Sequence, residues 1–366
     1  MSYKSILPII RGAVRTGETG PLVQAVDAAA CDKIDSEVLK LDFGTCKSDR
    51  EKAVLAFSEI TSLRKDGKNE PEFIRIAGEG CLRITPLPVS NRGRMTGRIS
   101  LVTGGAQGFG EEIVRNLVSE GAFVFIADLN IAKAEQLAEE LNNTAGVEVS
   151  MGIKVDVSDE DSVKHMVETV AEKSGGLDLF VNNAGVLRAG SVKSLDKRDF
   201  DFVTNINYTA YFLCVKHISQ LMAKQNLADG RYMSDIVQIN SKSGLEGSNK
   251  NAAYAGGKFG GIGLTQSFAL ELMEDNIKVN SICPGNFFEG PLWSDPENGL
   301  FVQYLNTGKV PGAKTIKEVK KFYEAKVPMG RGCRGEDVAR ALYYAVEQKY
   351  ETGQAIPVTG GQIMLN

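Results

Sequence analysis

From residue 97 onward, short apolar runs alternate with longer amphipathic stretches, and this alternation restricts the fold more than any other feature of the chain. Residues 99–103 and 123–127, for example, are almost uninterrupted apolar runs, as expected for strands that are buried on both faces. Strands and helices in strict alternation form right-handed crossovers between parallel strands. The sequence therefore predicts an α/β fold with a doubly wound parallel sheet, the Rossmann fold.

The expected elements continue to the C-terminus. We predict strands at residues 99–103, 123–127, 148–155, 177–182, 235–240, 278–283 and 355–359. We predict helices at residues 111–120, 132–141, 162–173, 198–225, 254–273 and 335–348. Together they define a Rossmann domain of residues 97–366.

The first 96 residues have a different pattern. Residues 20–30 and 50–64 have helical periodicity, whereas 73–77 and 81–85 are strand-like. Proline, asparagine and glycine residues between 86 and 93 then indicate a linker. We therefore predict that residues 1–96 form a small accessory α/β segment, to which the sequence assigns no role.

The composition limits the possible partners. Hydrophobic residues make up 43% of the chain, charged residues 24%, and the formal net charge is −4. This charge favours neither nucleic acid nor an anionic membrane as a partner. No apolar run reaches the roughly 18 residues of a membrane span. Because Arg11 and Arg15 follow the apolar patch near the start, that patch lacks the layout of a signal peptide. We therefore expect a cytoplasmic location.

The cysteines and histidines give no metal-site pattern. The six cysteines are scattered without a CxxC pair, and the chain has two histidines. Disulfide frameworks and zinc sites have characteristic spacings that are absent here. We therefore expect reduced cysteines and no bound metal.

A glycine-rich turn follows the first strand of the alternating series. A turn of this kind lets the backbone approach a pyrophosphate, and the next helix presents free N–H groups to the phosphates. By itself the turn could equally be a tight connection, but its place after the first strand favours a dinucleotide site. The expected cofactor contacts in the turn are Gly104, Gln107, Gly108, Phe109 and Gly110.

Acidic residues end the next two predicted strands. Asp128 is placed to accept hydrogen bonds from the adenosine ribose and to repel a 2′-phosphate, which favours NAD over NADP. No lysine or arginine occurs at 104–110 or 129–130 to attract that phosphate. Asp156 and Val157 are placed to border the adenine. Helix capping is the alternative role for both aspartates.

Tyr254 and Lys258 are four residues apart and share one face of a predicted helix. A nearby ammonium lowers the pKa of a phenol, which would otherwise be near 10. Ser241 ends the preceding strand, where its hydroxyl can hold a substrate oxygen. Without the glycine turn, the tyrosine and lysine would be interpreted as a solvated helix face.

These motifs together resemble the short-chain dehydrogenase/reductase family over residues 97–366. The family motifs correspond to Thr103 to Gly110, Asn182-Asn183-Ala184-Gly185, Asn207, Ser241, Tyr254 with Lys258, and Pro284-Gly285. The resemblance implies an oxidoreductase that uses NAD to interconvert a secondary alcohol and a ketone. One departure is Asn240, which stands before Ser241 where a second serine is common.

The family roles are carried over to matching positions. Tyr254 would be the general acid and base, Lys258 would assist it and hold the nicotinamide ribose, and Ser241 would orient the carbonyl. Asn207 would anchor a water in the proton relay. The remaining cofactor contacts implied by the family are Asn183, Ala184, Gly185, Pro284, Gly285 and Asn286.

Residues 286–332 correspond to the substrate lid of the family and are called the lid segment below. From here to the C-terminus the chain resembles the sorbitol-6-phosphate 2-dehydrogenases, a group within the family. Residues 306–334 contain eight basic and two acidic residues, which suits a phosphorylated ketose or polyol. The candidate phosphate ligands are Arg331, Arg334, Lys242 and Arg188. The alternative for the lid lysines is a solvated helix face.

Two other functions are compatible with the motifs. One is reduction of another carbonyl, such as a 3-oxoacyl thioester, or oxidation of an unphosphorylated polyol. The other is a non-catalytic NAD(H)-sensing protein, although all four catalytic positions are filled. The resemblance also implies a homodimer or homotetramer formed through the helices that carry Asn207 and Tyr254.

Overall fold

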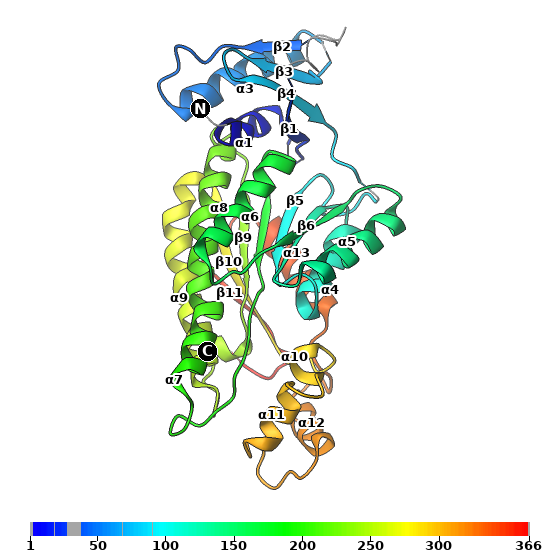
Figure 1. The fold of residues 1–366 in the computed structure, drawn as a ribbon, viewed down its shortest axis with the longest axis vertical. Helices are drawn as coiled ribbons and strands as arrows, with labels where there is room; N and C mark the ends of the chain where they lie inside the picture. The colour runs from blue at the N-terminus through cyan, green and yellow to red at the C-terminus, as the bar shows by residue number, and fades with distance from the viewer. Residues whose placement is uncertain (1–2, 18, 28–37, 68, 90, 365–366) are drawn as a thin grey trace.

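The computed structural model describes residues 3–17, 19–27, 38–67, 69–89 and 91–364. Two sheets organise these residues, one of four strands near the N-terminus and one of seven strands after it. The smaller sheet lies at one end of the elongated molecule, and helices α10–α12 of the lid segment lie at the other (Figure 1).

The seven-stranded sheet is parallel throughout and confirms the predicted Rossmann fold. Its strands are, in spatial order, β11 (Ala355–Val358), β10 (Ile277–Pro284), β9 (Ser234–Ile239), β8 (Leu179–Asn182), β5 (Ile99–Thr103), β6 (Phe123–Asp128) and β7 (Ser150–Lys154). The chain runs from β5 outward to β7 and then returns to β8 on the other side of β5. The direction of winding therefore reverses between β5 and β8.

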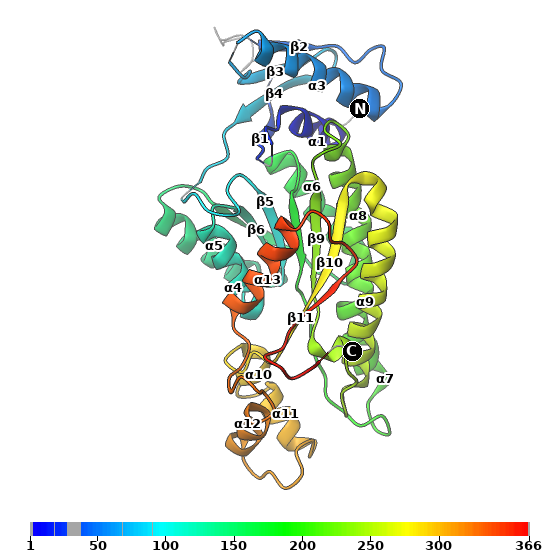
Figure 2. The same cartoon turned by 180° about the vertical axis from the view of Figure 1, so that it is seen from behind.

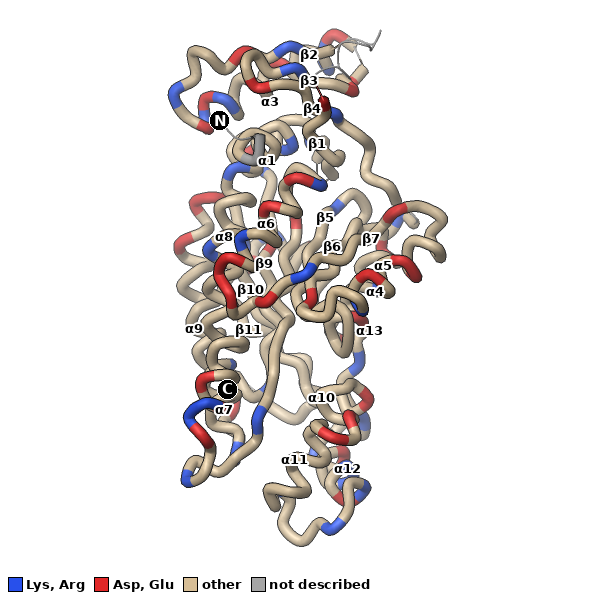
Figure 3. Tube along the Cα trace, in the orientation of Figure 1, with Lys and Arg blue, Asp and Glu red and all other residues tan. Residues whose placement is uncertain are grey.

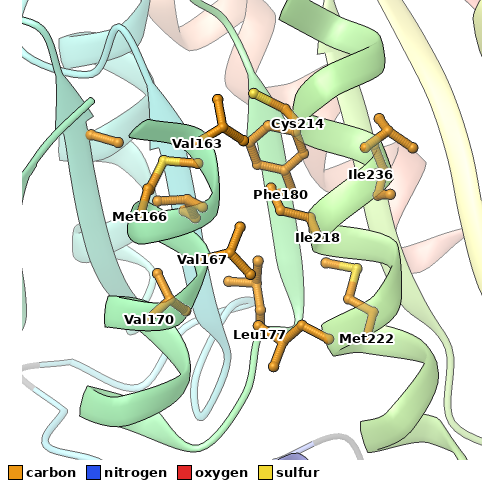
Figure 4. Packing of buried hydrophobic residues seen from close by; sticks show 14 of the residues in the cluster. Val163, Met166, Val167, Val170, Leu177, Phe180, Cys214, Ile218, Met222 and Ile236 are labelled. Atoms are coloured by element: carbon orange, nitrogen blue, oxygen red, sulfur yellow. The ribbon is translucent and has the colours of Figure 1, made fainter. Parts of the chain in front are cut away.

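Helices cover both faces of this sheet. One face packs against α6 (Glu160–Ser174), α8 (Ala210–Asn226) and α9 (Ala252–Leu272). Phe180 of β8 lies between Val163 of α6 and Ile218 of α8 in this core (Figure 4). The other face packs against α4 (Gly108–Ser119), α5 (Ile131–Ala145) and α13 (Gly335–Glu347), as Figure 2 shows. Apolar burial on both faces explains why the strands are continuous apolar runs.

The helix predicted at 198–225 is interrupted. It consists of α7 (Lys197–Thr204), a π-helical turn at Asn205–Thr209, and α8. A π turn contains one extra residue in the helical repeat and is frequent at functional sites. Here it contains Asn207, one of the expected catalytic residues.

The N-terminal segment differs in part from its prediction. The helix predicted at 50–64 and the strands predicted at 73–77 and 81–85 correspond to α3 (Asp49–Lys65), β3 (Phe73–Ile76) and β4 (Gly80–Thr85). The helix predicted at 20–30 is wrong, because β1 (Leu22–Val26) pairs antiparallel with β4. Residues 28–30 of that prediction lie outside the described residues.

Two elements of this segment were not predicted. Helix α1 (Tyr3–Val14) and strand β2 (Val38–Leu41) are these two among the described residues, and the sheet order is β1-β4-β3-β2. The apolar face of α1 is buried together with residues of α3 and the small sheet. The apolar patch near the start of the chain is therefore part of a core.

A buried carboxylate joins α1 to the larger sheet. Asp178, just before β8, accepts hydrogen bonds from Arg11 at 2.7 and 2.8 Å and forms an ion pair with Arg15. Burial acts to raise the pKa of Asp178, but the two guanidinium groups outweigh it and hold that pKa well below its usual value. Asp178 also accepts from the Ile99 N–H and from the Tyr232 hydroxyl. The accessory segment is thus fixed to the amino-terminal edge of the parallel sheet.

The expectation of reduced cysteines is wrong at one position. Cys81 in β4 is disulfide-bonded, whereas Cys46, Cys214, Cys283 and Cys333 are free. The cysteines have no local spacing pattern that indicates a disulfide, so the sequence did not reveal this bond. Among the described helices, none is long and apolar enough to span a membrane.

We predict that Asp178→Asn lowers stability strongly, because it leaves Arg11 and Arg15 buried without a carboxylate partner. Loss of one member of a buried pair typically costs about 3–5 kcal/mol. Urea unfolding measures the change. Asp201→Asn, which disrupts the exposed Lys197–Asp201 pair, is the matched control and should change stability by less than about 1 kcal/mol. Equal unfolding midpoints for the two variants would contradict the role of Asp178.

Candidate active site

The predicted site residues gather at the carboxyl edge of the parallel sheet. Strand β5 ends directly before Gly104, and β6 ends at Asp128. Strands β8, β9 and β10 end directly before Asn183, Asn240 and Gly285, respectively. Ligands of open α/β sheets bind at this edge, where the winding reverses. The site therefore lies at the end of the sheet opposite to Asp178 and the accessory segment.

The glycine turn has the backbone geometry of a phosphate cradle. Gly104 and Gly108 adopt φ values of 60° and 61°, which other residues rarely adopt. A Cβ atom on Gly110 would lie 1.9 Å from the Gly104 carbonyl oxygen, so the start of α4 packs against the turn only with glycine there. The turn therefore holds its shape through glycines, and the N-terminus of α4 faces the carboxyl edge of the sheet.

Hydrogen bonds join the turn to the end of β8. The Asn183 side-chain amide donates to the carbonyl oxygens of Thr103 and Gly104, both at 3.0 Å. In return, the Thr103 hydroxyl accepts from the backbone N–H groups of Asn183 and Ala184. These bonds fix the two strand ends between which a dinucleotide would lie.

Asp128 connects the glycine turn to the β6–α5 connection. Its carboxylate accepts from the Ala106 N–H at 3.1 Å and from the Asn130 N–H at 2.9 Å. The N-cap of α5 is Asn130, so Asp128 does not have the alternative capping role. Lys133 Nζ lies 3.4 Å from Gln107 Oε1, so a basic group lies beside the glycine turn. The sequence did not predict this lysine as part of the site.

The two residues after β7 that were predicted to border the adenine, Asp156 and Val157, contact neighbouring residues of the chain. Asp156 is exposed, and its carboxylate accepts from the backbone N–H and the hydroxyl of Ser158. The N-cap of α6 is Asp159, so capping is not the role of Asp156. Val157 is buried in the hydrophobic core.

Tyr254, Lys258 and Ser241 come together between α9 and the end of β9. The Tyr254 hydroxyl is hydrogen-bonded to Ser241. Lys258 Nζ lies 5.6 Å from the centre of the Tyr254 ring and donates to the Ile239 carbonyl oxygen at 2.9 Å. The predicted catalytic face of the helix therefore faces the end of the sheet.

Burial controls the ionisation of these groups. It raises the pKa of Tyr254, and the hydrogen bond from Ser241 opposes this change only in part. Burial also lowers the pKa of Lys258 to about 8. Lys258 is not among the groups that shift the pKa of Tyr254 here, so its expected role in lowering that pKa stays a prediction. A phenol that remains protonated at neutral pH can donate a proton.

Asn207, which belongs to the π turn, lies near Lys258 of α9. Its side chain donates to the Val186 carbonyl oxygen at 2.7 Å and accepts from the Val186 N–H at 3.0 Å. A Cβ atom on Gly185 would lie 2.9 Å from Asn207 Oδ1 and 4.0 Å from Lys258 Nζ. Gly185 therefore keeps open the space in which these two side chains meet.

Asn240 connects the serine to the catalytic helix. Its amide nitrogen donates to the Lys258 carbonyl oxygen at 2.9 Å, and its Oδ1 accepts from the Ser241 N–H at 2.8 Å. A serine side chain is too short to make both bonds. The departure from the common serine thus gives an additional link between β9 and α9.

The start of the lid segment lies against the cofactor side of the site. Pro284 and Gly285 are held by β11, since the Gly285 N–H donates to the Val358 carbonyl oxygen at 2.9 Å. Asn286 follows, and its buried amide nitrogen has no hydrogen-bond partner. Phe287 stacks on Phe109 of the glycine turn with ring centres 4.6 Å apart.

This arrangement fits a dinucleotide. The glycine turn provides a cradle that side chains would fill, and Asn286 provides a buried donor that a carboxamide can satisfy. Among the described residues, no group of three or more His, Cys, Asp or Glu side chains is arranged to bind a metal.

The rest of the lid segment forms its own aromatic core beside Tyr254. It contains α10 (Pro291–Ser294), α11 (Leu300–Asn306) and α12 (Ile316–Glu324). Trp293, Tyr304 and Tyr323 pack together, and Tyr254 lies against this cluster. The lid segment therefore packs apolar surface against Tyr254, the predicted catalytic tyrosine.

Two of the predicted phosphate ligands have other partners in this structure. Arg331 donates to both carboxylate oxygens of Asp337, at 2.6 and 2.9 Å. The exposed Arg188 packs over the Phe202 ring. Arg334 is exposed at the start of α13, whereas Lys242 is half-buried directly after Ser241. Of the four, Lys242 is the one that directly follows a predicted catalytic residue in the chain.

Three other lysines, which no sequence motif distinguishes, lie in the same part of the structure as Lys242. Lys242, Lys250 and Lys326 lie close enough to Lys309 to lower its pKa, and Lys326 also lowers the pKa of Lys242. Lys309 and Lys326 were included in the count of basic lid residues, but nothing in their spacing distinguished them from exposed ones.

Comparison with known proteins identifies the class. The family model described as short chain dehydrogenase matches residues 98–292. The chain belongs to the short-chain dehydrogenase/reductase family, which confirms the resemblance found in the sequence. It is therefore an oxidoreductase that acts on alcohol or carbonyl groups.

Individual relatives cover most of the chain. The sorbitol-6-phosphate 2-dehydrogenase of Escherichia coli K12 is 38% identical over 270 residues, which are 73% of this chain and 99% of the relative. The crystal structure of sorbitol-6-phosphate 2-dehydrogenase SrlD from Erwinia amylovora has a TM-score of 0.67 and 39% identity, and it covers 73% of this chain and 100% of that one. A 3-oxoacyl-(acyl-carrier-protein) reductase of Thermotoga maritima is 31% identical over 278 residues, which are 74% of this chain and 100% of the relative.

We predict that Asp128→Ser shifts cofactor preference toward NADP(H). Removal of one carboxylate beside the 2′-phosphate position removes a repulsion of about 1–4 kcal/mol, so the ratio of kcat/KM for NADPH to that for NADH should rise at least about tenfold. Steady-state rates with both cofactors measure this ratio. Glu139→Gln, which neutralises an exposed carboxylate on α5, is the control. An unchanged ratio in Asp128→Ser would rule out this residue as the discriminator.

Proposed function

We propose that the protein is an NAD(H)-dependent dehydrogenase that interconverts a polyol phosphate and a ketose phosphate, with sorbitol 6-phosphate and fructose 6-phosphate as the first candidates. The observation that carries the proposal is the similarity to two sorbitol-6-phosphate 2-dehydrogenases over almost their whole lengths. The catalytic residues and the lysine-rich surroundings of Ser241 support it.

The proposed proton chemistry follows from the environment of Tyr254. In ketone reduction, its protonated hydroxyl would donate to the carbonyl oxygen, which Ser241 holds through a second hydrogen bond. In alcohol oxidation the phenolate would accept the proton, with Lys258 and Asn207 connecting the site to the proton relay. The nicotinamide, when bound, supplies or accepts the hydride. Burial under the lid segment would keep bulk water from the reacting carbon.

Cofactor binding is assigned to the carboxyl edge of the sheet. We propose that the glycine turn and the N-terminus of α4 hold the pyrophosphate, and that Asp128 binds the adenosine ribose. Asn183, Gly185 and Asn286 would border the nicotinamide half. A preference for NAD follows from the Asp128 carboxylate, although Lys133 beside Gln107 weakens the repulsion of a 2′-phosphate.

We also propose a homodimer or homotetramer that forms through α8 and α9. Three large apolar side chains on these helices are exposed: Phe212, Phe259 and Leu270. Burial of such side chains against a second copy is favourable. A cytoplasmic location is part of the same proposal, because sugar phosphates and NAD occur together there. The disulfide at Cys81 is the one observation that does not favour this location.

A second candidate function is reduction of 3-oxoacyl thioesters. The similarity to the Thermotoga maritima reductase favours it, and the catalytic residues would act in the same way. The two functions differ in the substrate that turns over, so one assay separates them.

We predict that NADH oxidation is saturable with fructose 6-phosphate and much slower with unphosphorylated fructose or a 3-oxoacyl thioester. Absorbance at the NADH band measures the rates. Tyr254→Phe should lower kcat by about 10²–10⁴-fold, the usual contribution of a general acid. Tyr350→Phe, which makes the same change at a fully exposed phenol, should leave kcat unchanged.

Turnover of a 3-oxoacyl thioester without turnover of fructose 6-phosphate would replace the proposed function by the second candidate. Full activity of Tyr254→Phe would contradict the assignment of the proton donor for either substrate.

A further inference from the structure

Four lysines from separate parts of the chain meet beside the catalytic residues. Lys242 follows Ser241, Lys250 precedes α9, Lys309 follows α11 and Lys326 follows α12. The pKa of Lys309 is lowered to about 7, mainly by burial and then by the neighbouring charges of Lys242, Lys326 and Lys250. Figure 3 shows basic residues around α12, at the end of the molecule away from the accessory segment.

Uncharged groups hold Lys309 in place. Its ammonium donates to Ser248 Oγ at 3.1 Å and lies 4.1 Å from the centre of the Tyr304 ring. When the Asn251 amide is turned to satisfy its neighbours, its oxygen also accepts from Lys309 at 2.7 Å. The groups that shift the pKa of Lys309 are all lysines, so no carboxylate among them balances its charge.

The other lysines are held in similar ways. Lys326 lies 4.2 Å from the centre of the Phe322 ring, and Lys250 donates to the Thr307 carbonyl oxygen. The pKa of Lys242 is lowered by burial and by Lys326, and the exposed carboxylate of Glu246 opposes this change. The cluster therefore has an excess of positive charge, and the mutual repulsion and partial burial of these lysines destabilise the folded state.

The cluster also borders the reacting centre. Lys242 is adjacent to Ser241 in the chain. Tyr304 packs beside Lys309 and lies close enough to Tyr254 for Tyr254 to raise the pKa of Tyr304. A substrate whose carbonyl lies at Tyr254 and Ser241 would therefore extend its far end toward the lysines.

We propose that Lys242, Lys309 and Lys326 bind the phosphate of the substrate, with Lys250 as a positioning residue that holds the loop before Lys309. This inference rests on the proposed function and assigns the phosphate to a different place from Arg331 and Arg334. A phosphate dianion would offset the repulsion among the lysines and accept charge-assisted hydrogen bonds from them. Because Lys242 belongs to the sheet edge and the other two to the lid segment, the phosphate would also fasten the lid over the site.

Lys309→Gln tests the proposal, since it removes the charge and keeps a side chain of polar character. We expect the KM for fructose 6-phosphate to rise about 10- to 100-fold, the usual effect of losing a hydrogen bond to a charged group. The rate with unphosphorylated fructose should not change. Lys317→Gln, at an exposed lysine of α12, is the matched control and should leave both values unchanged.

The pH dependence provides a second readout. In the free enzyme the Lys309 ammonium is present below its pKa of about 7 and is lost as the pH rises above it. A sugar phosphate stays dianionic above its own pKa of about 6. From pH 7 to 9 we therefore expect kcat/KM for fructose 6-phosphate to fall relative to that for fructose. In Lys309→Gln this ratio should fall less over the same range, because Lys309 no longer contributes to it.

The outcomes separate the subsite from the proposed function. If the wild-type enzyme turns over fructose 6-phosphate and Lys309→Gln has an unchanged KM, the lysine site is wrong and the function stands. If no sugar phosphate is a substrate, the function is wrong, and calorimetric titration of inorganic phosphate into the protein with NADH tests the anion site. Weaker phosphate binding by Lys309→Gln than by Arg331→Gln would support the site, and equal binding by both variants would overturn it.

Discussion

The hydrogen bonds between the ends of β5 and β8 are the constraint on which the rest of the site depends. Thr103 and Asn183 join the two strands at the point where the sheet reverses its winding. Because every strand of this sheet is parallel, the residues after each strand meet at one edge. The glycine turn can then be a cradle, and Ser241 and Gly285 face it from the other half of the sheet.

The two ends of the molecule have different electrostatic organisation. At the amino-terminal edge, Arg11 and Arg15 neutralise Asp178, and the accessory segment is fixed there by compensated charge. At the carboxyl edge, Lys258 and Lys309 are buried or half-buried without carboxylate partners among the groups that shift their pKa values. Uncompensated charge of this kind is typical of functional sites, whereas compensated charge is typical of structural ones. The accessory segment therefore supports the sheet from the edge opposite to the reaction.

The sequence predicted the parts of the structure that depend on repeated hydrophobic patterns and on motifs of fixed residue spacing. The alternating elements and the positions of Tyr254, Lys258 and Ser241 at one site followed from periodicity and motifs. The accessory segment was predicted less well, because β1 is short and pairs with a distant strand. The phosphate ligands could not be selected from the lysine count, since burial against Tyr304 and proximity to Lys242 separate Lys309 from Lys317 only after folding. Arg331 was predicted as a phosphate ligand because a guanidinium binds oxyanions well, but in the structure its guanidinium is paired with the Asp337 carboxylate.

The most direct test of this account is a crystal structure of the protein with NADH and fructose 6-phosphate. The account predicts that the substrate carbonyl oxygen lies within hydrogen-bond distance of Tyr254 and Ser241, and that the phosphate lies among Lys242, Lys309 and Lys326. A phosphate bound at Arg331 and Arg334, or a carbonyl remote from Tyr254, would contradict it.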